Sequence, residues 1–331
     1  MPELATAFQT AQSNVEPNDE DWDNAPAAHD EVGRILAKDD DLSEWGIAPI
    51  LIGSYGRRVS IRRVFDVDMF CRLEEYPTGL AASDVIGKVH EVLVEEYGAE
   101  NVTRYDRSVT VLMPALDGLF VDIVPARQAG ATWEIPTRDG GWIETNPIKM
   151  TELKEDRNAE YGEMYVPCVK LLRQARRALM GKTKLGGFTV EMAFYTACDE
   201  GLVTGDTMGE FFASAMEGVA EIFRRVADEG FEMPDPSREG EVLEFDEEAD
   251  FGEARDKFTS AARDARAAYD MDEDEAGKAA LLLQGILGSN DDFTNVFPMP
   301  AGYDKDGNKR NYAAGSVAGN HKTTAGDLRF G

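Results

Sequence analysis

Short apolar runs mark the strands expected in the first half of the chain. Residues 47–52 and 66–73 are two such runs, and residues 109–113 and 119–124 are a further pair joined around an Asp-Gly dipeptide. Apolar runs bounded by turn residues predict strands, and an Asp-Gly pair between two of them predicts a hairpin. The first half is therefore expected to contain a sheet with at least four strands.

Helical spacing of apolar residues interrupts these strands and then dominates the second half. We expect one helix from about Pro26 and another from an N-cap at Ser83 to Tyr97. The chain turns helical after about Asn146. Five later segments share the helical period: 165–180, 188–200, 207–229, 251–269 and 274–287.

This order of elements predicts an α+β protein, in which a mixed sheet with helices is followed by an all-helical second lobe. Four regions are expected. Residues 1–24 are acidic and lack periodicity, which predicts a disordered tail, and residues 25–160 form the catalytic core. Residues 161–288 form the helical lobe, and residues 289–331, rich in Gly, Asn and Lys, form a flexible C-terminal tail.

Charge adds information about partners and habitat. The 331 residues include 63 acids and 34 Lys or Arg, for a formal net charge of −29. Because nucleic-acid binders are usually basic, we expect no stable nucleic-acid partner. Abundant acids with few lysines suggest a halophilic source.

No apolar run is long enough for a membrane span, and the three cysteines lie far apart, so a soluble cytoplasmic protein is expected.

The candidate chemistry centres on three aspartates. Asp66 and Asp68 are two residues apart on a predicted strand, so their carboxylates should lie on one face of the sheet. Asp122 lies on a later strand between Val121 and Ile123. Exposed strand-end aspartates are the simpler alternative, but the apolar neighbours suggest buried strands, where unpaired carboxylates cost several kcal/mol. Divalent metal ligation by Asp66, Asp68 and Asp122 resolves that cost.

A turn at Gly53 and Ser54 follows the first predicted strand. Its free amides, with the Ser54 hydroxyl, could hold the β and γ phosphates of a nucleotide. Two Mg²⁺ ions about 4 Å apart, or Mn²⁺ in their place, would activate an attacking sugar hydroxyl and stabilise departing pyrophosphate. The three aspartates are thus expected to be catalytic.

Two windows lack acids within this acidic chain. Residues 51–65 contain four arginines, including Arg57, and residues 164–190 contain six cations, including Lys170 and Lys184. A solvated basic stripe is the simpler interpretation. We instead expect both windows to meet at one polyanion, the triphosphate.

Gly-Ser, a basic spacer and Asp-x-Asp, with a third Asp on a later strand, resemble the signature of polymerase-β-like nucleotidyltransferases. Within that superfamily, residues 26–200 resemble the cGAS/DncV-like nucleotidyltransferases (CD-NTases) of bacteria and archaea, which make cyclic or linear oligonucleotide second messengers in anti-phage signalling. Four stretches carry this narrower resemblance: 29–52, 120–126, 135–147 and 166–172.

The resemblance implies an ATP or GTP cleft between a mixed sheet and a helical lobe. Lys170 matches the family's helical lysine that reaches the triphosphate. The family often has a serine near the phosphates where this chain has Gly187, so only an amide is available there. Phe188 could stack on a base, although a core position is an equal alternative.

Two other functions stay open at this point. An RNA- or protein-directed nucleotidyltransferase would use the same aspartates, and an inactive nucleotide-binding scaffold would bind nucleotides without turning them over.

Relatives of the family can be conjugated through their C-terminal residue, which makes Gly331 a candidate attachment point for a protein partner. The identity of the nucleotides and the linkage are not predicted.

Overall fold

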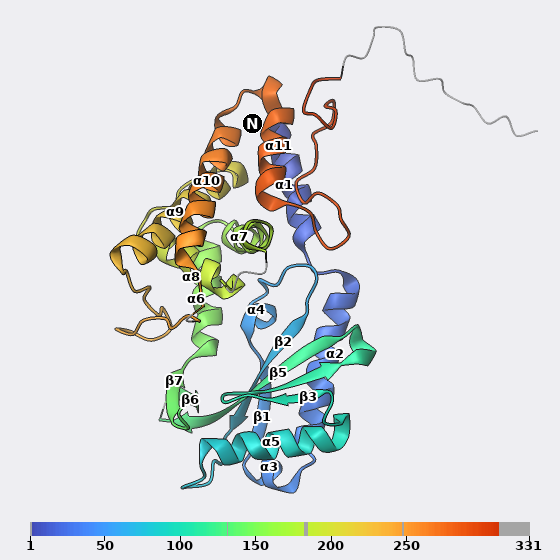
Figure 1. Cartoon of the computed structure of the whole chain (residues 1–331), viewed down its shortest axis with the longest axis vertical. Coiled ribbons are helices and arrows are strands. Elements are labelled where there is room, and N and C mark those ends of the chain that lie inside the picture. Colours follow the sequence, from blue (N-terminus) through green and yellow to red (C-terminus); the bar gives the residue numbers. More distant parts are fainter. Residues whose placement is uncertain (1, 131, 182–184, 247, 311–331) are drawn as a thin grey trace, which may run out of the picture.

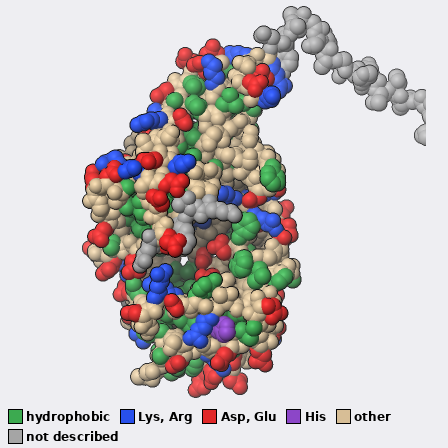
Figure 2. Space-filling view, viewed as in Figure 1, with side chains coloured by type: hydrophobic (Ala, Val, Ile, Leu, Met, Phe, Trp, Pro, Cys, Tyr) green, Lys and Arg blue, Asp and Glu red, His purple; other side chains and the backbone are tan. Residues whose placement is uncertain are grey.

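The computed structural model describes residues 2–130, 132–181, 185–246 and 248–310. It has two lobes, a sheet-containing core and a helical lobe, which lie one above the other in Figure 1. The predicted α+β class is confirmed. Acidic side chains are spread over the face seen in Figure 2 rather than gathered in one patch, as the net charge leads one to expect.

The core contains a seven-stranded mixed sheet. Five strands lie in the order β1-β2-β5-β4-β3, and a β6–β7 hairpin extends from β5. β2 and β5 pair in parallel, and the other pairs are antiparallel. The strands are β1 (Ile47–Leu51), β2 (Asp66–Leu73), β3 (Val102–Arg104), β4 (Val109–Met113), β5 (Leu119–Ala129), β6 (Thr132–Pro136) and β7 (Trp142–Thr145).

One face of this sheet is covered by α2 (Asp19–Leu36) and α5 (Ala82–Tyr97), with the short α3 (Asp40–Glu44) beside β1. Along β2, alternate residues Val67, Met69 and Cys71 are fully buried in that core. Because strand side chains alternate, Asp66 and Asp68 lie on the opposite face. The sheet therefore presents its carboxylates away from its own hydrophobic core.

Both predicted helix starts in the core need correction. α2 begins at Asp19 rather than near Pro26, because Asn18 and Asp21 form a reciprocal capping box that starts the helix earlier. α5 begins at Ala82 after Ala81, so Ser83 lies inside its first turn and is not the N-cap.

The prediction of a disordered tail over residues 1–24 is wrong. Residues 2–15 form α1 (Pro2–Val15), whose stripe of Leu4, Phe8 and Ala11 is buried in the helical lobe. The Phe8 ring centroid lies 5.0 Å from that of Phe297 in an edge-on contact. The helical spacing of these apolar residues explains the helix, and the acidic residues that follow obscured it in the sequence.

The helical lobe is built around one large core formed by α1 and the helices that follow the sheet. Its long helices α9 (Met208–Glu229) and α10 (Phe251–Asp270) lie side by side (Figure 1). α6 (Pro147–Glu160) leads from the sheet into this lobe, and the other helices are α7 (Tyr165–Met180), α8 (Gly187–Asp199), α9 (Met208–Glu229), α10 (Phe251–Asp270) and α11 (Ala276–Leu287). Of the helices described, none combines the length and apolar character that crossing a bilayer requires.

The prediction of a flexible tail from residue 289 is also wrong for its first part. Residues 289–310 return along the helical lobe, where Val296, Phe297 and Tyr303 are buried. These three apolar side chains explain why the segment is held despite its Gly- and Asn-rich composition. Residues 311–331, and with them Gly331, lie outside the described residues.

Candidate active site

The parallel pairing of β2 and β5 brings the three aspartates to one place. Asp68 is the register partner of Asp122, and Asp66 lies two residues earlier on the same face of β2. The Asp122 carboxylate accepts a hydrogen bond of 2.8 Å from the Thr110 hydroxyl on β4. The sheet therefore places Asp68 and Asp122 side by side on neighbouring strands.

The aspartate face is more open than the sequence suggested. The strand was expected to be buried on both faces, but Asp68 is half-buried and Asp66 is exposed. Burial, followed by the charges of Asp66 and Asp122, raises the pKa of Asp68 to about 6. The carboxylates thus oppose one another's ionisation, which is the electrostatic situation that a bound cation relieves.

Three carboxylates are the hard oxygen donors that Mg²⁺ and Mn²⁺ prefer. Burial, and then the charges of Asp66 and Asp122, raise the pKa of Asp68, and a bound cation would favour its ionised form. Within the described ranges, however, no group of three acidic, histidine or cysteine side chains is drawn together closely enough to enclose an ion. The three carboxylates are suitable ligands for Mg²⁺ or Mn²⁺ and lie on neighbouring strands. Metal binding by these residues stays a prediction.

Gly53 lies so close to the Asp68 side chain that there is no room for a side chain at position 53. It has a φ of +65°, and a Cβ built there would lie 1.6 Å from Oδ2 of Asp68. A side chain at this position would both strain the backbone and displace the carboxylate. Gly53 begins the short α4 (Gly53–Gly56), so the turn predicted to hold phosphates does lie beside the aspartates.

Ser54 follows in the same turn. Its hydroxyl lies 2.9 Å from the hydroxyl of Ser60, so the two side chains share a hydrogen bond. The backbone N–H of Ile52 donates to the carbonyl of Asp68 at 3.0 Å, which ties the start of the turn to β2. A phosphate contact by Ser54 stays a prediction.

Arg57 connects the two lobes. Its Nε and Nη2 each donate at 2.9 Å to the two carboxylate oxygens of Glu191 on α8, and both side chains are buried. Arg173 on α7 lies 3.5 Å from the same carboxylate. Neither Glu191 nor Arg173 is among the site residues predicted from the sequence. A single acid within the apolar stretch of α8 was the available signal.

Lys170 has a carboxylate partner in this structure. It is 5% exposed, and its Nζ lies 2.5 Å from Oε2 of Glu16, in the segment between α1 and α2. The helical prediction for Lys170 is correct. Its contact with a triphosphate stays a prediction, and it would require exchange of this partner.

The remaining predicted nucleotide contacts lie at the start of α8. Gly187 is the first residue of that helix, and Phe188 is 38% exposed, with its ring 5.5 Å from Cζ of Arg57. Phe188 and Arg57 line a cavity of about 310 Å³ that also touches Asn146 on the core side. Stacking of a base on Phe188 fits this position and stays a prediction. Lys184 lies outside the described residues.

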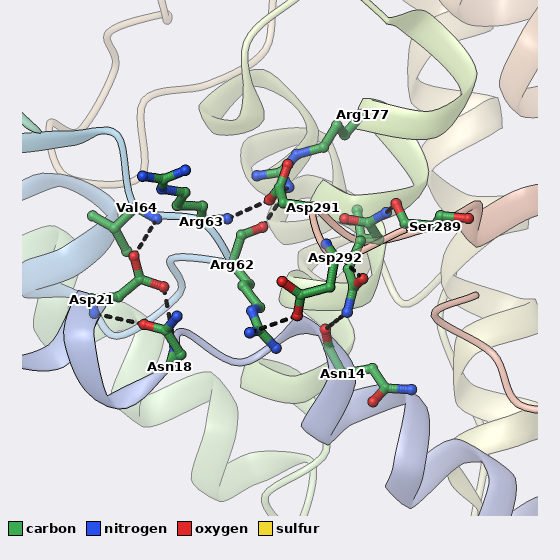
Figure 3. Close-up of polar contacts among 12 residues, drawn as sticks. Asn14, Asn18, Asp21, Arg62, Arg63, Val64, Arg177, Ser289, Asp291 and Asp292 are labelled. Carbon is green, nitrogen blue, oxygen red and sulfur yellow. Dashed lines mark hydrogen bonds and ion pairs between the residues drawn. The ribbon is translucent and has the colours of Figure 1, made fainter. Parts of the chain in front are cut away.

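The two acid-free windows do meet, but much of their charge is matched by carboxylates (Figure 3). Arg62 pairs with Asp292 at 2.6 Å, and the backbone N–H of Arg63 donates to Asp291 at 2.7 Å. Arg177 donates to the carbonyl of Arg62 and lies 3.0 Å from Asp291. These arginines therefore tie the segment after α11 to the core.

We predict a modest stability contribution from this contact. Replacing Asp291 by Ala removes the acceptor of the Arg63 amide and an ion pair to Arg177, so the free energy of unfolding should fall by about 1 kcal/mol. Thermal unfolding measures this, with Asp306→Asn, an exposed residue in the turn over residues 304–307, as the control. Equal melting temperatures for Asp291→Ala and the parent protein would contradict the assigned contact.

The raised pKa of Asp68 predicts a pH-dependent response to Mg²⁺. Between about pH 4 and about pH 6 the folded protein binds more protons at Asp68 than the unfolded chain does, so this group's contribution to stability falls as pH rises. A cation competes with that proton. The increase in Tm on adding Mg²⁺ should therefore be small at about pH 4.5 and grow through about pH 6 to 7. An increase that is independent of pH, or the same in Asp68→Asn, would contradict this prediction.

The two-lobed fold, with paired aspartates beside a Gly-Ser turn, matches the fold of polymerase-β-like nucleotidyltransferases. Residues 3–158 match the family model SMODS, described as the Second Messenger Oligonucleotide or Dinucleotide Synthetase domain. The predicted resemblance to the cGAS/DncV-like nucleotidyltransferases is confirmed by this match and by the similar proteins described next.

A curated relative and several solved structures are similar over most of the chain. A cyclic AMP-AMP-AMP synthase of Acinetobacter sp. (strain ATCC 27244 / 9458) is 25% identical over 333 residues, covering 94% of this chain and 90% of the relative. The structure of E. coli MS115-1 CdnC with ATP has a TM-score of 0.66 at 15% identity, covering 89% of this chain and 98% of that one. Vibrio cholerae DncV, a cyclic AMP-GMP synthase, has a TM-score of 0.59 at 15% identity, covering 89% and 88%. At this identity the structures establish the fold.

Proposed function

We propose that this protein joins nucleoside triphosphates into a cyclic or linear oligonucleotide second messenger and releases pyrophosphate. The observation that carries the proposal is the pairing of Asp68 with Asp122 across β2 and β5, directly beside the Gly53 turn. The SMODS match over residues 3–158 supports the same class of reaction.

Different residues of the chain would bind the metal ions, the phosphates and the base. Asp66, Asp68 and Asp122 would hold Mg²⁺ or Mn²⁺, which when bound supplies charge stabilisation for displacement at phosphorus. Gly53 keeps the turn close to Asp68, and Ser54 offers a hydroxyl to the phosphates. Arg57 and Glu191 hold the helical lobe against the core, and Phe188 offers an exposed ring to a base.

ATP is the substrate that we propose first. The relative named as a cyclic AMP-AMP-AMP synthase aligns over most of the chain, and similar structures contain ATP or GTP. We extend the proposal to an anti-phage signalling role, as the resemblance to the cGAS/DncV-like enzymes implies.

A polymer-directed transferase is the competing candidate. The surface in Figure 2 argues against an RNA substrate, because acidic side chains are spread over the visible face and would repel a phosphate backbone. An RNA-directed enzyme normally requires a basic path for its strand.

Product analysis tests the proposal. The protein is incubated with all four triphosphates and Mg²⁺ or Mn²⁺, with and without RNA, and products are identified by mass spectrometry. We expect short oligonucleotides that contain adenylate and form without RNA. Label that appears only on RNA or on protein, or nucleotide binding without any product, would overturn the proposal.

A further inference from the structure

The segment that follows α9, over residues 231–246, forms one wall of the cavity beside Phe188. In Figure 1 it descends from the helical lobe towards the β6–β7 hairpin. Met233, 1% exposed, anchors it in the core of that lobe, and the N–H of Leu243 donates to the carbonyl of Met233 at 2.9 Å. Its residues 235, 237, 238, 243 and 244 line the cavity of about 310 Å³. An ordered loop of the helical lobe therefore faces Phe188.

Asp235 fixes the position of Arg238 in this loop. The Asp235 carboxylate is buried and accepts hydrogen bonds from the N–H and the hydroxyl of Ser237, at 2.9 and 2.7 Å, and from Nε of Arg238, at 2.7 Å. The Arg238 side chain is only 15% exposed. Its two terminal nitrogens have no hydrogen-bond partner among the described residues. Arg238 thus offers the cavity two donors in a preset orientation.

The opposite wall, which belongs to the core, contributes a second guanidinium. Arg107 lies in the turn between β3 and β4 and lines the same cavity. Its Nε is buried without a hydrogen-bond partner among the described residues, and its Nη2 lies 3.8 Å from Oε2 of Glu244, too far for a hydrogen bond. The cavity therefore has more donors than acceptors, with one arginine from each lobe.

This excess of donors favours some bases over others. A base stacked on Phe188 would turn an edge towards the loop. Guanine and hypoxanthine carry two acceptors on one edge, O6 and N7, which match two N–H groups of an arginine, whereas adenine replaces O6 with an amino donor. A base that leaves buried donors unpaired is strongly disfavoured. Glu244 could accept from an amino group, but its side chain is 67% exposed, so water competes for that contact.

We propose that Arg238, held by Asp235, selects the base that binds beside Phe188, and that it favours a purine with a keto group at C6 over adenine. The inference rests on the proposed function in that it takes a nucleotide as the ligand. It adds a guanylate-type base to the adenylate expected in the product.

Binding measurements with matched ligands test this selection without relying on turnover. The full-length protein is titrated, with Mg²⁺, with the non-hydrolysable β,γ-imido analogues of ATP and of inosine triphosphate, whose bases differ only at C6. The inosine analogue should bind about tenfold to a hundredfold more tightly. Arg238→Met should weaken the inosine analogue to the level of the adenosine analogue and leave the latter unchanged. Arg266→Met, an ion-paired arginine of the same lobe outside this cavity, is the control and should keep the parent's ratio.

Two further changes separate contact from positioning. The 7-deaza form of the inosine analogue lacks the N7 acceptor and should bind the parent at least about fivefold more weakly than the inosine analogue itself. Asp235→Asn keeps the charge of Arg238 but weakens the bond to its Nε, so the preference for the inosine analogue should shrink without disappearing. An unchanged preference in Asp235→Asn would contradict the positioning role of that carboxylate.

The outcomes separate this inference from the proposed function. A preference for the inosine analogue that Arg238→Met removes supports the inference even if the parent protein makes no oligonucleotide. Equal binding of the two analogues by the parent, tighter binding of the adenosine analogue, or binding of neither overturns it even if the parent is an active synthase. Equal weakening of both analogues in Arg238→Met, or a preference that persists there, also overturns it, because a base-selecting contact must discriminate between them.

Discussion

Asp68→Asn is expected to lower the rate of oligonucleotide formation about a thousandfold or more, which corresponds to about 4 kcal/mol of lost transition-state stabilisation. Asp68 is the register partner of Asp122 and the carboxylate that Gly53 contacts, so it occupies the centre of the site. An amide of the same shape keeps the packing but removes the negative charge that a divalent cation requires. The rate is measured by pyrophosphate release from ATP with Mg²⁺.

The same substitution should stabilise the metal-free protein. The pKa of Asp68 is raised to about 6, so the ionised carboxylate is unfavourable in the folded state at neutral pH and the neutral amide is not. A higher Tm together with lost turnover would show that the carboxylate serves chemistry rather than folding. Parent-like pyrophosphate release in Asp68→Asn would contradict the assigned site.

Gly53→Ala is expected to have the second largest effect, and to reduce both stability and activity. The new Cβ would overlap Oδ2 of Asp68, and the backbone at φ +65° disfavours any side chain. We expect activity to fall at least about a hundredfold, because the carboxylate must move, and stability to fall by about 1 kcal/mol or more.

Gly162→Ala is the matched control for that experiment. Gly162 has a φ of +56°, but a Cβ there would meet no atom within 4 Å. It therefore carries the backbone strain without the clash. Loss of stability with unchanged activity in Gly162→Ala, set against loss of both in Gly53→Ala, would assign the activity loss to displacement of Asp68. Similar kinetics in the two variants would contradict the close contact.

The sheet and the aspartate pair were predictable because both depend on local pattern. Apolar runs of strand length identified β1, β2, β4 and β5, and strand alternation placed Asp66 and Asp68 on one face. The alignment of Asp68 with Asp122 depends on which strands pair and in what register, which the sequence does not specify. The family resemblance supplied that step.

The two ends of the chain were misjudged for a common reason. α1 and residues 289–310 are held by contacts between segments far apart in sequence, such as the ring contact between Phe8 and Phe297 and the pairing of Arg62 with Asp292. Composition alone suggested disorder for both. When a segment is buried only by residues far away in the sequence, its own composition and periodicity give little indication that it is ordered.

The sequence indicated which two segments supply the basic residues, but it did not indicate which partner each of these residues has. Both acid-free windows do contribute to the junction of the lobes, yet Glu191, Asp291 and Asp292 match much of their charge. Which of these cations has a carboxylate partner depends on side-chain packing, as the contact between Lys170 and Glu16 illustrates.

A crystal structure with Mn²⁺ and a non-hydrolysable ATP analogue tests the central claim most directly. We expect anomalous density for manganese between the carboxylates of Asp66, Asp68 and Asp122, with the triphosphate running from the Gly53 turn towards the helical lobe. Manganese bound elsewhere, or Asp122 turned away from a nucleotide that lies beside Asp68, would contradict it.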